Sequence, residues 1–408
     1  MSILVTVCIL LLLAYVFDLT ASFTKIPSVI LLLISGWGVQ QLAKWVHVTV
    51  QDLNPLLPVL GTVGLILIVM DGALEIELDR SKIPMIKKSM VVAFIPMVML
   101  AFLLGYLFQY LGGYTLKDSL TYAMPFCVIS SSIAIPSVKS LNSRIREFVV
   151  FETSVSDILG VLFFNFLALN NVINTDSLVE FGVQIVVITL VSFIATVGLS
   201  LLLTKVDHHI KYSPIIIIII LIYGVSKFYH LPGLIFIIIF GIILGNLDQV
   251  RKLKFMHRLR PEALEGEVVK LKELLIETTF LIRALFFLLF GFLMETREML
   301  NPDTILYAVG IVLAIILTRV VQLLVLKIPL MPLLFIAPRG LITILLFVAI
   351  VPLPTDAIIN KSLIVQVIIL TSLVMMIGLM YTPKSLTAEA EEKEAVEVDE
   401  EAIEKLES

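Results

Sequence analysis

Long apolar runs follow one another along almost the whole chain, separated by short polar or charged connections. Runs of about 20 apolar residues match the length of an α-helix that crosses a ~30 Å hydrocarbon core. The pattern therefore predicts about thirteen transmembrane helices. We expect them at about residues 3–20, 27–43, 55–74, 88–111, 119–138, 148–169, 179–204, 213–227, 232–246, 273–294, 304–326, 331–351 and 362–382.

Composition agrees with this pattern and sets the C-terminus apart from the rest of the chain. Hydrophobic residues make up 59% of the 408 residues, and the mean hydropathy of +1.06 excludes a soluble globular protein. The segment 384–408 differs, because it carries ten acidic and three basic residues. We predict an all-α polytopic membrane domain over residues 1–383, followed by a solvated acidic tail that is too short to form a nucleotide-binding domain.

The Lys and Arg residues are unevenly divided between the two sides of the membrane. One set of connections holds eighteen of them and the opposite set holds five, while the other six of the 29 lie in the tail or within the predicted helices. Cytoplasmic connections carry the excess of Lys and Arg. We therefore expect the N-terminus outside and the C-terminus in the cytoplasm, in the plasma (inner) membrane of a prokaryote.

An acidic residue lies deep within one predicted helix. Asp157 is eleven residues beyond Arg146 and thirteen before Asn170, which at about 1.5 Å per residue places it ~16–20 Å from either flank, near the membrane midplane. A charge at this depth costs about 2.5–3.5 kcal/mol on insertion scales, and such acids usually bind ions or relay protons. Glu152 lies on the same helix, and Arg339 lies at a similar depth in a later one. These three residues indicate a transport site.

Two pairs of segments resemble each other in the same order along the chain. IPSVILLLISGWGVQ from Ile26 resembles LPGLIFIIIFGIILG from Leu231, and LILIVMDGALEIE around Asp71 resembles ALFFLLFGFLMET around Gly291. The members of each pair are seven predicted helices apart, and this odd offset makes the repeats antiparallel. Inverted repeats of this kind occur in many secondary transporters, which bind their substrates at the repeat interface.

The fifth and twelfth predicted helices correspond under this offset, and both contain helix-breaking residues. The fifth has two prolines and the serine run Ser130, Ser131 and Ser132, and the twelfth has the segment Pro338 to Gly340. Proline removes a backbone donor and leaves carbonyl oxygens free, and serine hydroxyls can also bind a hard monovalent cation. We therefore predict two broken helices that cross beside the buried acid.

With these motifs the chain resembles the monovalent cation:proton antiporters, most closely their sodium/proton exchanger branch. The segment ETSVSD, from Glu152 to Asp157, is similar to the E-S-x-x-N-D pattern of the sixth helix in that branch. Arg339-Gly340 matches an Arg-Gly pair in the twelfth helix, and Arg319 matches an arginine in the helix before it.

Two departures from the exchanger pattern leave the ion selectivity open. Ser156 stands where the exchanger branch usually has asparagine, and the run SSSIAI stands where that branch tends to carry T-D-P. The serine run resembles the S-S-T-A-I of the glutathione-gated potassium-efflux branch. The chain therefore resembles an outlying member of the exchanger branch.

The resemblance implies roles for the matching residues. Asp157 would be the carboxylate that binds either the cation or a proton. We expect the monovalent cation site to consist of Asp157, Ser156, Thr153, Ser130 and Ser131.

The resemblance also implies how the helices are held together and how they move. Glu152 and Arg339 would form a structural ion pair that joins the sixth and twelfth helices. One group of helices would form a dimerising scaffold and the other a moving core. We expect the scaffold at residues 1–74 and 213–294, and the core at 88–169 and 304–382.

These features favour a secondary active antiporter that exchanges Na⁺, or K⁺ or Li⁺, for H⁺ by electroneutral alternating access around Asp157, as in pH homeostasis. A potassium-efflux system of the glutathione-gated type and an ion-coupled solute carrier are the alternatives. The sequence has no Ser/His/Asp, HExxH or GxGxxG arrangement, so we do not expect an enzyme. We expect no cofactor besides the transported ions. The expected partners are the lipid bilayer and a second copy of the chain, and no nucleic acid is expected to bind.

Overall fold

The computed structural model describes residues 3–24, 26–47, 53–76, 83–170, 175–205, 212–229, 231, 233–247, 261–350 and 358–386, and their regular structure is helical. The acidic tail beyond residue 386 lies outside these ranges. The longer helices are α1 (Ile3–Thr24), α2 (Ser28–Trp45), α3 (Leu56–Glu75), α4 (Ile83–Gly112), α5 (Leu116–Cys127), α6 (Ser131–Ser137), α7 (Ser143–Leu169), α8 (Thr175–Lys205), α9 (Tyr212–Phe228), α10 (Leu234–Gly245), α12 (Pro261–Phe292), α14 (Pro302–Val325), α15 (Leu341–Ile350) and α16 (Lys361–Met380). The one-turn helix α13 (Thr296–Met299) connects α12 to α14.

Each of the thirteen predicted transmembrane helices coincides with a helix of the structure, and two of them are broken as predicted. The fifth is divided into α5 and α6, and only the second half of the twelfth is helical, as α15. Seven described segments are long and apolar enough to cross a membrane, and four further apolar helices are shorter. The predicted all-α membrane fold is therefore confirmed, and the number of thirteen crossings stays a prediction.

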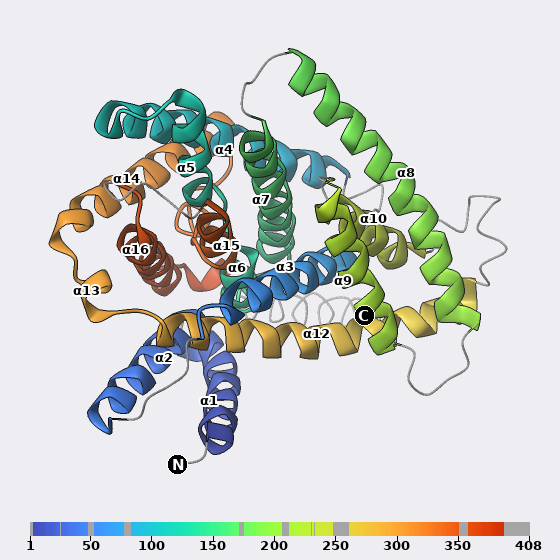
Figure 1. The fold of residues 1–408 in the computed structure, drawn as a ribbon, viewed down its shortest axis with the longest axis horizontal. Helices are drawn as coiled ribbons and strands as arrows, with labels where there is room; N and C mark the ends of the chain where they lie inside the picture. Colours follow the sequence, from blue (N-terminus) through green and yellow to red (C-terminus); the bar gives the residue numbers. More distant parts are fainter. Residues whose placement is uncertain are drawn as a thin grey trace, which may run out of the picture.

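The helices pack in two groups that meet along α3 (Figure 1). In one group α2 and α3 pack against α12, α3 packs against α10, and α8 lies along the outside against α10. In the other, α4 packs against α5, α7 and α14, while α15 packs against α5 and α14 against α16. Since α3 contacts both α7 and α15, it faces the second group along the helices that carry the predicted site residues.

Two helix crossings in the first group support the predicted inverted repeat. A methyl group at Gly36 of α2 would overlap the carbonyl oxygen of Leu288 in α12. Gly241 of α10 lies in the same way against α3, where an added methyl group would lie 3.2 Å from the carbonyl oxygen of Met70. Gly36 and Gly241 are equivalent in the repeated segments, so α2 crosses α12 as α10 crosses α3. Small residues let such helices approach closely and gain packing contacts without a hydrophobic driving force.

An ion-pair cluster connects α1 with both groups. Asp18 of α1 lies 3.6 Å from Arg283 Nη2 of α12 and 3.4 Å from Lys139 Nζ, which follows α6. The carboxylate therefore balances charge on Arg283, an arginine within an apolar helix, where an unpaired charge would be costly.

Candidate ion-binding site

The two broken helices cross at their non-helical segments. The backbone is extended from Val128 to Ser130, between α5 and α6, and the Ser130 N–H donates to the carbonyl of Pro338, 2.9 Å away in the other broken helix. Gly340 permits this close approach, because a methyl group on it would lie 2.6 Å from Ser130 Oγ. Irregular backbone at membrane depth is tolerated only where protein or water satisfies its polar groups, and this crossing satisfies one of them.

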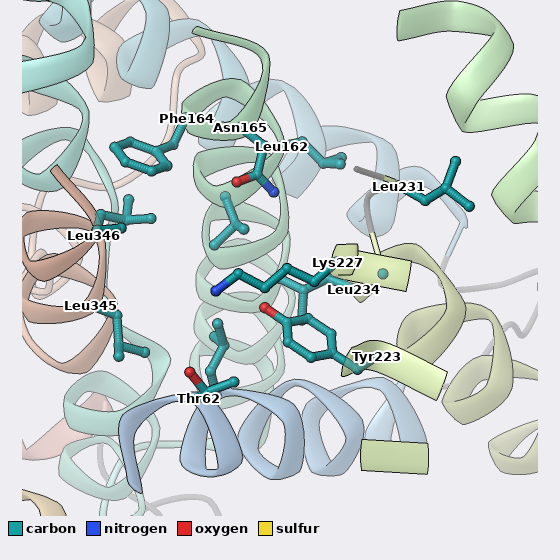
Figure 2. Close-up of a pocket in the computed structure, with 14 residues that line it drawn as sticks. Thr62, Leu162, Phe164, Asn165, Tyr223, Lys227, Leu231, Leu234, Leu345 and Leu346 are labelled. Atoms are coloured by element: carbon teal, nitrogen blue, oxygen red, sulfur yellow. The ribbon is translucent and has the colours of Figure 1, made fainter. Parts of the chain in front are cut away.

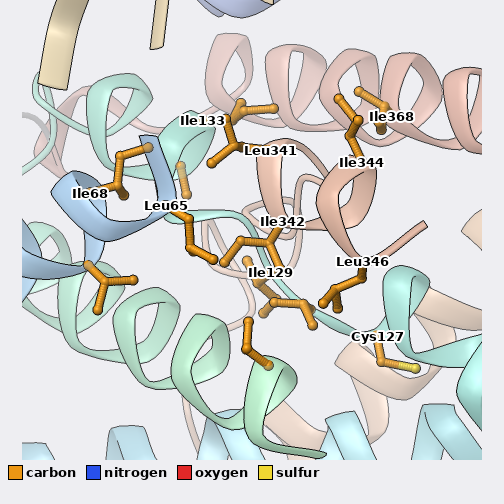
Figure 3. Close-up of a cluster of buried hydrophobic side chains, with 14 of the residues drawn as sticks. Leu65, Ile68, Cys127, Ile129, Ile133, Leu341, Ile342, Ile344, Leu346 and Ile368 are labelled. Carbon is orange, nitrogen blue, oxygen red and sulfur yellow. The ribbon is translucent and has the colours of Figure 1, made fainter. Parts of the chain in front are cut away.

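Apolar side chains from both broken helices surround the crossing. Leu65 and Ile68 of α3, Ile129 and Ile133 of the first broken helix, and Leu341 of the second belong to one buried cluster (Figure 3). This packing fixes the relative position of α3, α6 and α15, and it excludes bulk water from the carboxylate described next.

Asp157 lies beside the start of α6, and only 2% of its surface is exposed. Its Oδ2 accepts hydrogen bonds from the hydroxyl of Ser131 and from the Ser131 N–H, 3.3 Å away. Both donors lie in the first turn of α6, where the free N–H groups of a helix favour a negative charge. The other oxygen, Oδ1, is buried and has no hydrogen-bond partner among the described residues.

A small cavity of about 10 Å³ borders Asp157. Ser131 and Ser154 supply hydroxyl groups to its wall, and Ile68, Val69, Ala73, Ile76 and Ile158 supply apolar surface. Gly72 of α3 lies opposite, where an added methyl group would approach Ser154 Oγ to 2.9 Å. The volume is close to the least that holds one water molecule. The cavity can therefore hold one small ion or water between a carboxylate oxygen and two hydroxyl groups.

Only two of the five residues predicted to bind the cation lie at this cavity. Asp157 and Ser131 line it. Ser156 instead accepts the Ile129 N–H at 3.0 Å, Thr153 donates to the carbonyl of Val149 in its own helix at 2.8 Å, and Ser130 pairs with a neighbouring serine hydroxyl.

Sequence reasoning missed Ser154 as a site residue. Its spacing was informative, since residues three apart lie on the same face of a helix and Ser154 precedes Asp157 by three. Glu152 and Thr153 face other partners. Ser156 does face the crossing, but it binds the Ile129 N–H there and does not line the cavity.

The predicted ion pair of Glu152 with Arg339 is wrong, because the partner of Glu152 is Arg319 of α14. Both carboxylate oxygens of Glu152 accept from the Arg319 guanidinium, one of them at 2.8 Å from Nη2. Glu152 is 0% exposed and Arg319 3% exposed, so this is a bidentate, fully buried pair. Arg319 also donates from Nε to the carbonyl of Leu333, at 3.1 Å, and so ties α7, α14 and the second broken helix together.

Arg339 instead satisfies the backbone of the broken helices. Its Nε donates to the carbonyl of Phe126, at the end of α5, at 2.6 Å, and Nη1 donates to the carbonyl of Ala337 at 2.7 Å. Its own N–H donates to Thr371 Oγ1 of α16 at 3.0 Å. The last carbonyls of a helix lack partners and carry partial negative charge, so a cation there is stabilising. Depth in the membrane predicted a buried role for Arg339, but the carbonyls at the break decided its partners.

A second, larger cavity of about 140 Å³ lies between the two helix groups, one to two turns along α7 from Asp157. Val161 and Asn165 of α7 line it, together with Thr62 of α3 and Tyr223 and Lys227 of α9 (Figure 2). Leu65 borders this cavity and Ile68 borders the smaller one, so the apolar cluster at the crossing lies between the two.

Comparison with known proteins agrees with this architecture. The sequence profile of the family described as "Sodium/hydrogen exchanger, transmembrane" matches residues 8–384. Among curated proteins, none matches the chain significantly by sequence. Two structures of the sodium proton antiporter MjNhaP1 from Methanocaldococcus jannaschii share the fold at 18% sequence identity. The match to the structure at pH 8 has a TM-score of 0.65 and covers 92% of this chain and 97% of the antiporter chain. The match to the electron-microscopy structure has a TM-score of 0.64 and covers 93% of this chain and 95% of the antiporter chain. With a profile match over nearly its whole length, the chain belongs to the sodium/hydrogen exchanger family.

Proposed function

We propose that this protein exchanges Na⁺ for H⁺ across the membrane and that Asp157 binds the two ions in turn. The observation that carries the proposal is Asp157, whose buried Oδ1 has no hydrogen-bond partner among the described residues and whose side chain borders a cavity of single-ion size. A buried ionised carboxylate is costly unless a cation, a proton or hydrogen bonds compensate it. Oδ1 is therefore the atom at which a proton and a cation compete.

The hydroxyl groups around the cavity suit a hard monovalent cation. Ser131 and Ser154 border the cavity with Asp157, and oxygen atoms are the ligands that hard cations prefer. The Ser131 N–H holds Oδ2 in place at 3.3 Å and leaves Oδ1 to the transported ion. Bound Na⁺, or a bound proton, leaves Asp157 without net charge, so either loaded form can cross a low-dielectric barrier that the empty carboxylate cannot.

We assign the movement to the second helix group. In this scheme α4–α7 and α14–α16 form the core that carries Asp157, and α1–α3 with α9, α10 and α12 form the scaffold. The narrow contact of the scaffold with the core along α3 supports this division. We further propose that the scaffold forms a homodimer. We also propose that the N-terminus lies outside the cell, because the excess of Lys and Arg lies in the connections on the other side of the membrane from it.

Proton movement in proteoliposomes tests the proposed function directly. We expect a preformed pH gradient to dissipate when Na⁺ is added outside, as read from dequenching of a pH-sensitive dye. Parallel titrations with Li⁺ and K⁺ rank the ions. A response to K⁺ alone would favour the potassium-efflux alternative, and no cation-dependent response from a reconstituted, folded protein would contradict the proposal.

We expect the exchange to be electroneutral, with one cation for one proton. Serine does not ionise near neutral pH, so Ser156 adds no charge beside Asp157, and Glu152 is engaged by Arg319. One titrating carboxylate then carries one charge in either direction. Solid-supported-membrane currents under a sodium gradient should be close to zero. A sustained current that reverses with the gradient would indicate a second titrating group and contradict this expectation.

A further inference from the structure

The larger cavity contains one fixed charge. Lys227 of α9 is the only ionisable Lys, Arg, Asp, Glu or His residue among those that line it. The other polar side chains in the wall are neutral: Thr62, Asn165 and Tyr223. Figure 2 shows the Lys227 side chain extending from α9 toward α7 among the residues that line the cavity.

The charge of Lys227 is not balanced by a described neighbour. Among the described residues, no ion pair or hydrogen bond involves its amine, and Lys227 is exposed and lines the cavity. A lysine in the wall of a cavity near a cation-binding carboxylate opposes the charge of an approaching cation. A structural lysine would instead be expected to pair with an acid or to bind carbonyls, as Lys361 does with Glu298 at 3.1 Å and with the carbonyl of Leu293 at 2.7 Å.

The cavity lies beyond Asp157 toward the C-terminal end of α7. Its lining residues Val161 and Asn165 follow Asp157 by four and eight residues on α7, which corresponds to about 6 Å and 12 Å along the helix. The smaller cavity, by contrast, is bounded by residues nearer the other end of α3, such as Ala73 and Ile76. The larger cavity therefore lies toward the membrane face opposite to the one that the smaller cavity approaches.

We propose that Lys227 lowers the affinity of the transport site for cations on the membrane face to which the larger cavity opens, and on that face only. The inference rests on the proposed function, because it requires Asp157 to be the cation site and α7 to move relative to α9. When the core brings Asp157 toward this cavity, the amine repels the cation, and when the core moves away the amine stays behind on the scaffold. A cation carried to this face is then released more readily, while the coupling ratio is unchanged.

The test compares vesicles of opposite orientation. Right-side-out and everted membrane vesicles that contain the full chain present the two faces to the medium, and the Na⁺ concentration for half-maximal exchange is measured in each. We expect Lys227→Gln to lower this concentration by about two- to fourfold, the size of effect that one charge exerts at ~10–15 Å through a partly aqueous medium. The effect should occur in only one orientation, leave the maximal rate unchanged, and shrink when choline chloride screens the charge.

Two further variants separate charge from structure. Lys227→Arg keeps the charge and should retain the wild-type Na⁺ dependence. Lys44 is predicted to lie on the same side of the membrane as Lys227, but it does not line the cavity. Lys44→Gln should therefore leave the Na⁺ dependence unchanged. An unchanged Na⁺ dependence of Lys227→Gln in both orientations, an equal shift in both, or the same shift in Lys44→Gln would overturn the inference. Wild-type protein without cation-dependent proton movement would instead refute the proposed function, so the two failures are distinguishable.

Discussion

Replacing Asp157 with asparagine should abolish cation-dependent proton movement and leave the protein folded. The asparagine side-chain oxygen can still accept from the Ser131 hydroxyl and N–H that now bind Oδ2. The neutral amide can neither release a proton nor balance the charge of Na⁺, so the exchange cycle has no ionisable group. Cation-dependent dequenching in proteoliposomes should fall to the level of protein-free liposomes.

The result depends on a matched control and on a measure of folding. Asp176→Asn makes the same chemical change at an exposed residue in the first turn of α8, and it should exchange at the wild-type rate. The elution profile and thermal unfolding of Asp157→Asn in detergent should match those of the wild type. Exchange at a wild-type rate by a folded Asp157→Asn variant would remove Asp157 from the mechanism.

Replacing either partner of the buried Glu152–Arg319 pair should lower the stability of the protein more than replacing an exposed charged residue does. Removing one partner of a buried ion pair typically costs about 3–5 kcal/mol, because it leaves the other charge unpaired away from water. We expect Glu152→Gln and Arg319→Met each to lower the thermal stability strongly, and the double variant to recover part of the loss. Recovery will be incomplete, because Arg319 also donates to the carbonyl of Leu333.

Arg339 provides the control for this double-mutant cycle. Its guanidinium binds the carbonyls of Phe126 and Ala337 rather than Glu152, so Arg339→Met should destabilise the protein without being rescued by Glu152→Gln. Thermal unfolding of the single and double variants gives both coupling energies. Strictly additive losses for Glu152 with Arg319, or a larger coupling with Arg339, would contradict the pairing in the structure.

Much of the architecture could be predicted from the order of apolar runs and of a few polar residues within them. The burial of Asp157 followed from its distance to the charged and polar flanks, because a helix advances by a constant rise per residue. The broken helices followed from the proline and serine residues in corresponding positions. The break itself lies at Val128–Ser130, after Pro125, which is still part of the last turn of α5. Proline lacks a backbone donor and weakens the helix around it, so it located the break to within one turn.

What the sequence could not determine was which buried polar groups meet. Glu152 has arginines at similar depth on two later helices, and periodicity gives the face of each helix but not its rotation relative to a helix 160 or more residues away. The packing of α14 against α4 and α16 turns Arg319 toward α7, while the free carbonyls at the break hold Arg339. The same reason separates Ser131 and Ser154, which border the ion-sized cavity, from Ser156, Thr153 and Ser130, which do not. The sequence by itself determined the helices, their order and which of them carry buried charges, because these depend on local periodicity and hydropathy. Only the tertiary structure decided the partners, because a buried polar group binds whichever donor or acceptor the packing brings within about 3 Å.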